Sequence, residues 1–210
     1  MKKKERAQEI FQILDQQFQD AHCELHHQSP FQLLIATILS AQCTDVQVNK
    51  VTPLLFKKYP SAKDLAKAKN NDVEKIINST GFYKNKAKNI ILCADQINQH
   101  FKGELPKSIG ELTKLAGVGR KTANVLLGNA FNINEGIVVD THVKRISNLL
   151  KLTKHSDPIK IEKDLVKLFE RDQWTKISHL MIFLGRKICI ARRPKCNECS
   201  LNKICPSAKL

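Results

Sequence analysis

The sequence of 210 residues has no apolar run that approaches the roughly 20 residues required by a membrane-spanning helix. Its first ten residues, MKKKERAQEI, are basic but lack the continuous apolar segment of a secretory signal peptide, so they are expected to begin a helix. Internal repeats and low-complexity tracts are also missing. These absences favour a globular protein of the cytoplasm, away from any membrane, where thiols stay reduced.

Acidic residues are scarce relative to basic ones. Twenty Asp and Glu against 35 Lys and Arg give a formal net charge of +15. Such an excess opposes compaction by self-repulsion and usually has a polyanionic partner. Nucleic acid is the first candidate and anionic lipid the second. No heptad repeat or apolar surface stripe argues for assembly, so we expect a monomer.

Strand patterns are almost absent, and apolar residues recur at helical spacing along most of the chain. The segment FQLLIATILSA (31–41) is apolar on nearly all sides, which predicts a buried central helix with Ser29 as N-cap and Pro30 in its first turn. The one candidate strand, GIVVD (136–140), is too short to form a sheet alone. We expect an all-α fold of two helical lobes with a groove between them. Further helices are expected at 45–58, 61–67, 71–79, 83–101, 107–114, 120–131, 141–151, 158–170 and 173–188.

Four of the seven cysteines lie within the last 22 residues, at Cys189, Cys196, Cys199 and Cys205. In a reducing compartment, four thiols this close together indicate a metal site rather than four unrelated packing residues. Zinc ribbons usually pair two C-x-x-C knuckles, and only one is present here. Compact four-cysteine ligation therefore favours a 4Fe–4S cluster modestly over zinc. The other three cysteines lie in apolar helical contexts and are expected to be packing residues.

The loop between the first two of these cysteines carries Arg192, Arg193 and Lys195. A solvated basic loop is one interpretation. The other, with equal weight, is that a metal cluster holds the loop so that its cations contact phosphates.

The segment LAGVGRKTAN (115–124) has helical patterns on both sides. Gly117 and Gly119 permit φ above zero and close approach by another chain. Successive amides in such a turn, followed by a helix N-terminus, form an anion-binding nest, and Arg120 adds a cation. These features predict a helix–hairpin–helix element that binds a nucleic-acid phosphate.

Lys121 follows this turn at the start of the next helix. Most lysines are solvated surface cations, but an amine nucleophile must be neutral. The positive end of the helix, Arg120 and partial burial in a groove would all disfavour the protonated form. Such a lysine could form a Schiff base, assisted by a carboxylate. Asp140 follows the buried-looking IVV and could supply it, although Asp is also a favoured helix N-cap.

Four segments, LLIATILSAQCTDVQVNK, LAGVGRKTANVLL, VDTHVKRI and the cysteine pattern, resemble in this order the endonuclease III family of the helix–hairpin–helix DNA glycosylases. The resemblance runs from about residue 25 to residue 205. It implies a bifunctional repair enzyme that excises oxidised pyrimidines from double-stranded DNA and then cuts the strand at the abasic site by β-elimination. It also implies a 4Fe–4S cluster on the four C-terminal cysteines, and a location at the nucleoid.

Within that resemblance, Lys121 matches the catalytic lysine and Asp140 the catalytic aspartate. The implied domains are a six-helix domain with the hairpin, at 23–133, and an iron–sulfur cluster domain that joins 1–22 to 134–210, with the DNA groove between them.

The resemblance also implies DNA contacts outside the hairpin. Gln42 matches a residue that fills the space left by the extruded nucleotide, and STGFYKNKA matches a loop that wedges against the opposite strand. Asp45 matches an aspartate near the groove, or is merely a helix N-cap. Phe82 departs from the more usual aliphatic wedge, which leaves the preference for the opposite base open. Ala116 departs from a frequent proline, with an expected loss of about 0.4–1 kcal/mol of preorganisation.

Three other functions fit parts of the sequence. An adenine glycosylase of the same superfamily would lack the amine at position 121 and would carry a further C-terminal domain. A non-enzymatic DNA-binding module fits the charge, the hairpin and the cysteines, but leaves the pairing of Lys121 with Asp140 without a purpose. An electron carrier fits the cysteines but leaves the hairpin and the net charge of +15 unexplained.

Overall fold

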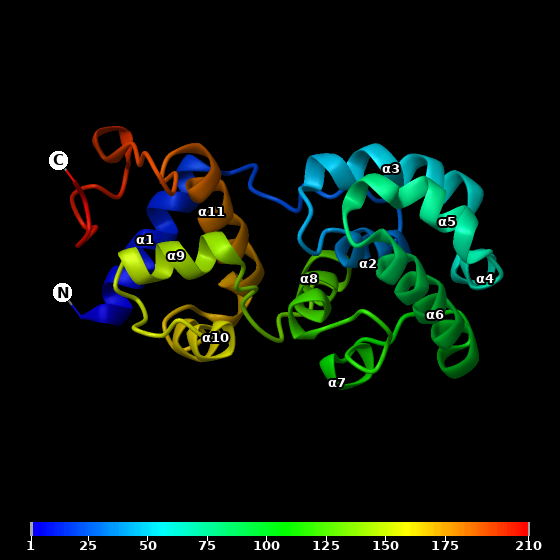
Figure 1. Cartoon of the computed structure of the whole chain (residues 1–210). Coiled ribbons are helices and arrows are strands. Elements are labelled where there is room, and N and C mark those ends of the chain that lie inside the picture. The colour runs from blue at the N-terminus through cyan, green and yellow to red at the C-terminus, as the bar shows by residue number, and fades with distance from the viewer. Residues whose placement is uncertain (1, 210) are drawn as a thin grey trace. The chain divides into compact units, whose positions relative to one another are not determined.

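The computed structural model describes residues 2–209, and within this range it is helical with no strand (Figure 1). The chain divides into two compact units. One spans Glu24–Glu135, and the other combines the described residues up to Cys23 with those from Gly136 onward. None of the helices in the described range is both long and apolar enough to cross a membrane.

The Glu24–Glu135 unit is built around α2 (Pro30–Leu39), whose residues 33–39 are all buried. This helix contacts α3, α6 and α8. It begins as predicted, because the Ser29 hydroxyl accepts a hydrogen bond from Gln32 N at 3.3 Å and Pro30 occupies the first helical position. The other elements of the unit are α3 (Asp45–Lys58), α4 (Ala62–Ala66), α5 (Asn70–Ile77), η1 (Asn78–Thr80), α6 (Tyr83–Phe101), α7 (Ile109–Leu112) and α8 (Arg120–Phe131).

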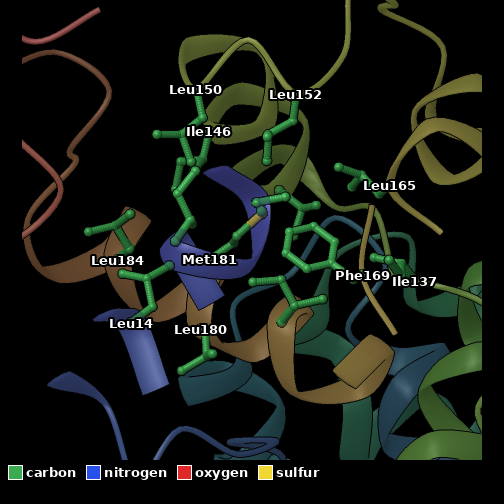
Figure 2. Packing of buried hydrophobic residues seen from close by; sticks show 14 of the residues in the cluster. Leu14, Ile137, Ile146, Leu150, Leu152, Leu165, Phe169, Leu180, Met181 and Leu184 are labelled. Carbon is green, nitrogen blue, oxygen red and sulfur yellow. The ribbon is translucent and has the colours of Figure 1, made fainter. Parts of the chain in front are cut away.

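The second unit joins the two ends of the chain. Its elements are α1 (Lys3–Gln17), α9 (Thr141–Leu149), α10 (Pro158–Leu165), η2 (Arg171–Gln173), α11 (Trp174–Lys187) and η3 (Cys196–Glu198). Figure 2 shows Leu14 of α1 packed in one apolar cluster with Ile146 of α9, Leu165 of α10 and Leu180 of α11. Burial of these side chains ties the first helix to the C-terminal region, far away in sequence.

The strand predicted at 136–140 is wrong. This segment is irregular, although Ile137, Val138 and Val139 are buried. The Val138 amide donates to the Ser178 hydroxyl at 3.1 Å. The Ser178 side chain therefore accepts the hydrogen bond that a neighbouring strand would have accepted in a sheet. The β-branched residues of this segment indicate burial rather than a strand.

Candidate functional site

The segment LAGVG forms the turn between α7 and α8. Gly117 has a φ of 76°, and a Cβ at this position would lie 3.1 Å from Asn89 Cβ and 3.2 Å from Ile38 Cγ2. Both conformation and space therefore require glycine at 117. Gly119 departs from the prediction, because its φ is −91° and a Cβ there would meet nothing within 4 Å. Only close approach by another molecule could require glycine at 119.

Ala116 fixes the same turn to α6. Its amide donates a hydrogen bond of 2.7 Å to Gln96 Oε1. A proline at 116 has no amide hydrogen and could not form this bond. The loss of rigidity expected from the absence of proline is therefore offset by a contact that proline would exclude.

Arg120 and Lys121 are the first two residues of α8, directly after the Gly119 N-cap. The first hydrogen bond of the helix runs from Ala123 N to Gly119 O, so the helix ladder does not use the amides before Ala123, although the Val118 amide donates to Leu115 O at 3.1 Å within the turn. Both basic side chains are exposed. The partial burial expected of Lys121 is not observed, and water would be removed from its amine only by a bound ligand.

Asp140 is the N-cap of α9, in the second unit. Its Oδ1 accepts a hydrogen bond of 2.8 Å from Val143 N, and the side chain is half-buried. The cap engages one carboxylate oxygen and does not engage Oδ2. Asp140 therefore caps the helix with one carboxylate oxygen, and its second oxygen takes no part in the cap.

Gln42 and Phe82 lie in two turns of the Glu24–Glu135 unit and share an uncommon conformation. Their φ angles are 52° and 48°, in the left-handed region that residues other than glycine rarely adopt. Gln42 is exposed, and the Phe82 side chain is 66% exposed. A strained backbone that presents an exposed aromatic ring to solvent is unfavourable in the isolated protein, which suggests a binding role.

Asp45 is the first residue of α3 and not its N-cap. The cap is Thr44, whose Oγ1 accepts a hydrogen bond of 3.2 Å from Gln47 N. The alternative interpretation of Asp45 as an N-cap is therefore wrong. Its side chain is half-buried at the start of the helix.

The four C-terminal cysteines line one cavity of about 230 Å³. No group of three or more His, Cys, Asp or Glu among residues 2–209 is gathered closely enough to hold a single metal ion. Four cysteine thiolates around one cavity are a donor set that iron–sulfur clusters use. The donor set therefore fits an iron–sulfur cluster.

Arg145 connects α9 to this cavity. Its Nη1 donates to Cys189 O at 2.6 Å and lies 3.5 Å from Cys189 Sγ. Burial raises the pKa of the Cys189 thiol, and the Arg145 guanidinium acts in the opposite direction by stabilising the thiolate. The helix capped by Asp140 is thus attached to one of the four cysteines.

The basic loop is only partly available to a ligand. Arg192 and Lys195 are exposed but also line the cysteine cavity, and Lys195 Nζ lies 3.3 Å from Glu198 Oε2. Arg193 is exposed as well. Of the other three cysteines, Cys93 is buried and burial raises its pKa to about 12, in keeping with a packing residue. Cys23 and Cys43 are half-buried.

Sequence reasoning missed Lys86, which is buried in α6. A signal was present, because Lys86 is in phase with the buried residues Ile90, Cys93 and Ile97 of the same helix. A lysine within an apolar stripe indicates a buried ammonium, which requires specific acceptors.

A protein-family model described as "HhH-GPD superfamily base excision DNA repair protein" matches residues 35–171. Endonuclease III of Synechocystis sp. is 53% identical over 207 residues, which cover 99% of this chain and 94% of that relative.

Two solved structures are also similar over nearly the whole chain. One is a non-covalent endonuclease III–DNA complex, with a TM-score of 0.93, 42% identity, and coverage of 99% of this chain and 97% of that chain. The other is a trapped covalent endonuclease III–DNA intermediate, with the same TM-score and identity, and coverage of 99% and 98%.

Proposed function

The chain belongs to the endonuclease III family of base-excision-repair DNA glycosylases and abasic-site lyases, and we propose that Lys121 and Asp140 act on oxidised pyrimidines in duplex DNA. The observation that carries this proposal is the position of Lys121. Its exposed amine follows a turn in which the amides of Gly117 and Gly119, together with Arg120, suit a phosphate. A phosphate bound there would bring a sugar carbon to the amine.

In the proposed reaction the neutral Lys121 amine attacks C1′ of the damaged nucleotide. The bond between nitrogen and C1′ forms as the glycosidic bond breaks, and the base leaves with its bonding electrons and gains a proton. Loss of the amine proton and opening of the sugar then give an imine. The imine acidifies the C2′ proton, and its removal expels the 3′ phosphate by β-elimination.

Asp140 is proposed to serve this reaction with the carboxylate oxygen that its cap does not engage. A carboxylate there can take the proton of the attacking amine or stabilise the positive charge that develops on the sugar. The capping bond to Val143 N holds the side chain in one orientation. Catalysis and capping are therefore compatible in one residue.

Binding of the duplex is proposed to involve three groups of residues. The hairpin would hold a phosphate through Gly117, Gly119 and Arg120. The exposed Gln42 would fill the space left by the extruded nucleotide, and the exposed Phe82 would wedge against the opposite strand. Asp45 would lie near the active-site groove. The basic loop (Arg192, Arg193 and Lys195) would contact the backbone, with Lys195 first giving up its ion pair with Glu198.

We further propose that Cys189, Cys196, Cys199 and Cys205 hold a 4Fe–4S cluster that organises this loop. A cluster bound by these four cysteines would hold the loop between Cys189 and Cys196 in one conformation. Purified protein should be yellow-brown and contain about four irons per chain. Stoichiometric zinc in place of iron would contradict the assignment. The protein is proposed to act as a monomer in the cytoplasm at the nucleoid.

The test of catalysis compares two aspartates that cap helices of the same unit. Asp140 caps α9, and Asp157 caps α10 by accepting from Lys160 N at 2.9 Å. Asparagine retains the capping oxygen in both. On a duplex that contains thymine glycol, Asp140→Asn should slow base release by about 100-fold or more with unchanged DNA affinity, and Asp157→Asn should leave the rate unaltered. Equal rates for the two variants would reduce Asp140 to a helix cap.

A further inference from the structure

Lys86 is a buried cation that joins two turns of the Glu24–Glu135 unit. It is 5% exposed, and its Nζ donates hydrogen bonds to Leu39 O at 2.8 Å and to Thr80 O at 2.7 Å. Burial lowers the pKa of this amine. An ammonium is kept in such a place only where its acceptors compensate for the lost water, and both acceptors here are backbone carbonyls.

The two carbonyls belong to the segments that lead into Gln42 and Phe82. Leu39 is the last residue of α2, and Gln42 follows it by three positions. Thr80 is the last residue of η1, and Phe82 follows it by two. A single atom, Nζ of Lys86, is therefore hydrogen-bonded to the residue at the start of each turn.

Both turns end in strained and exposed residues. Gln42 and Phe82 each have a left-handed φ, which is unfavourable unless the surrounding structure holds it. A bond of 2.6 Å from Gln47 Nε2 to Ser79 Oγ joins α3, the helix after the Gln42 turn, to η1, but this bond is exposed to water. The buried contacts of Lys86 are thus the stronger constraint on the spacing of the turns.

We propose that Lys86 is a positioning residue that fixes the Gln42 and Phe82 turns at one spacing, so that they enter the duplex together and extrude the damaged nucleotide. This rests on the proposed roles of Gln42 and Phe82 in extrusion. Lys86 does not touch DNA or the reacting atoms. Its effect is confined to the step in which a stacked and paired base leaves the helix.

The proposal predicts a split between the two activities. Base release from a paired lesion requires extrusion, whereas an abasic site has no base to unpair and is extruded at lower cost. Lys86→Met retains the length of the side chain and removes the ammonium. It should slow base release from a paired thymine glycol by about tenfold or more and slow cleavage at a pre-formed abasic site by about threefold or less.

Control variants and a fluorescence signal distinguish loss of the buried ammonium from loss of charge alone. Lys88→Met removes the same charge from an exposed position of α6 and should behave as the wild type in both reactions. Lys86→Arg retains the donors and should recover part of the lost base release. 2-Aminopurine beside the lesion, whose fluorescence rises on unstacking, should report slower extrusion in Lys86→Met. If Lys86→Met does not fold, the same comparison uses Lys86→Gln, which retains one donor.

The outcomes separate this proposal from the proposed function. A wild-type protein that fails to incise thymine glycol duplex would overturn both. If the wild type incises, equal losses of base release and abasic-site cleavage in the Lys86 variant would make the residue merely structural. A variant that matches Lys88→Met in both reactions and in the fluorescence signal would also overturn the proposal.

Discussion

The amide hydrogen of Ala116 determines which residues the hairpin turn tolerates at this position. Replacement by proline would normally stabilise a turn by about 0.4–1 kcal/mol. Here Ala116→Pro removes the bond to Gln96 Oε1 and leaves that acceptor unpaired, so we expect destabilisation of about 1–2 kcal/mol. In a Gln96→Leu background the same proline should be neutral or stabilising. Thermal unfolding of the four proteins gives the comparison, and an identical effect of proline in both backgrounds would contradict this role of the bond.

The two glycines of the hairpin should respond differently to the same substitution. Gly117→Ser places a side chain at a φ of 76° beside Asn89 and Ile38, and should destabilise the protein by about 1–2 kcal/mol. Gly119→Ser has an ordinary φ, open space and a favoured N-cap hydroxyl, so stability should be unchanged or slightly higher.

At position 119 we expect the substitution to weaken DNA binding and to leave the stability of the protein unchanged. A phosphate that approaches the turn closely would meet the added hydroxymethyl group, so Gly119→Ser should weaken binding without loss of stability. Fluorescence anisotropy with a labelled duplex, alongside thermal unfolding, measures both. If Gly119→Ser binds DNA with unaltered affinity, no phosphate approaches this part of the turn.

Some residue roles followed from the sequence and others depended on packing. Ser29 and Pro30 were predicted at the start of α2 because capping chemistry is local. The requirement for glycine at 117 but not at 119 was not predictable, since it depends on Asn89 and Ile38, which lie far away in sequence. The acceptors of Lys86 come from two other elements for the same reason.

At the scale of elements, helical periodicity predicted most of the helices, and three of them, at 45–58, 83–101 and 120–131, with their bounds. The short helix predicted at 107–114 begins two residues later, because Ser108 caps it by accepting from Glu111 N at 3.3 Å. The segment 136–140 shows the limit of periodicity. Its apolar run records burial, and burial occurs in a strand and in an irregular segment alike.

Helix α11 carries a pH-dependent contribution to stability. Burial, with smaller effects from His22 and Lys176, lowers the pKa of His179 from 6.5 to about 4. Between these values the unfolded chain binds the proton and the folded chain does not. The free energy of unfolding should therefore fall by up to about 3 kcal/mol as the pH drops from 6.5 to 4, with no contribution from His179 above 6.5.

A variant isolates this effect from carboxylates that titrate in the same range. His179→Gln cannot take up the proton, so its unfolding free energy should depend less steeply on pH between 6.5 and 4 than that of the wild type. Denaturant unfolding at several pH values gives both slopes, and NMR titration of the histidine ring protons gives the pKa directly. A His179 that titrates near 6.5 would contradict the burial argument.

For the whole molecule, the net charge of +15 predicts that DNA binding is dominated by phosphates. The logarithm of the association constant should fall linearly with the logarithm of salt concentration, with a slope of about −0.9 for each phosphate contacted. Damaged and undamaged duplexes should give similar slopes, because the lesion adds no phosphate. A flat dependence, measured by anisotropy from low to physiological salt, would exclude an electrostatic interface.

The central claim is that the Lys121 amine becomes bonded to the sugar of the damaged nucleotide, and borohydride reduction during turnover tests it most directly. On duplex that contains thymine glycol, the wild-type protein should yield a covalent protein–DNA adduct, and so should Lys114→Ala, which removes an exposed lysine before the same hairpin. Lys121→Ala should bind the duplex and yield no adduct. An adduct of wild-type yield from Lys121→Ala would contradict the account.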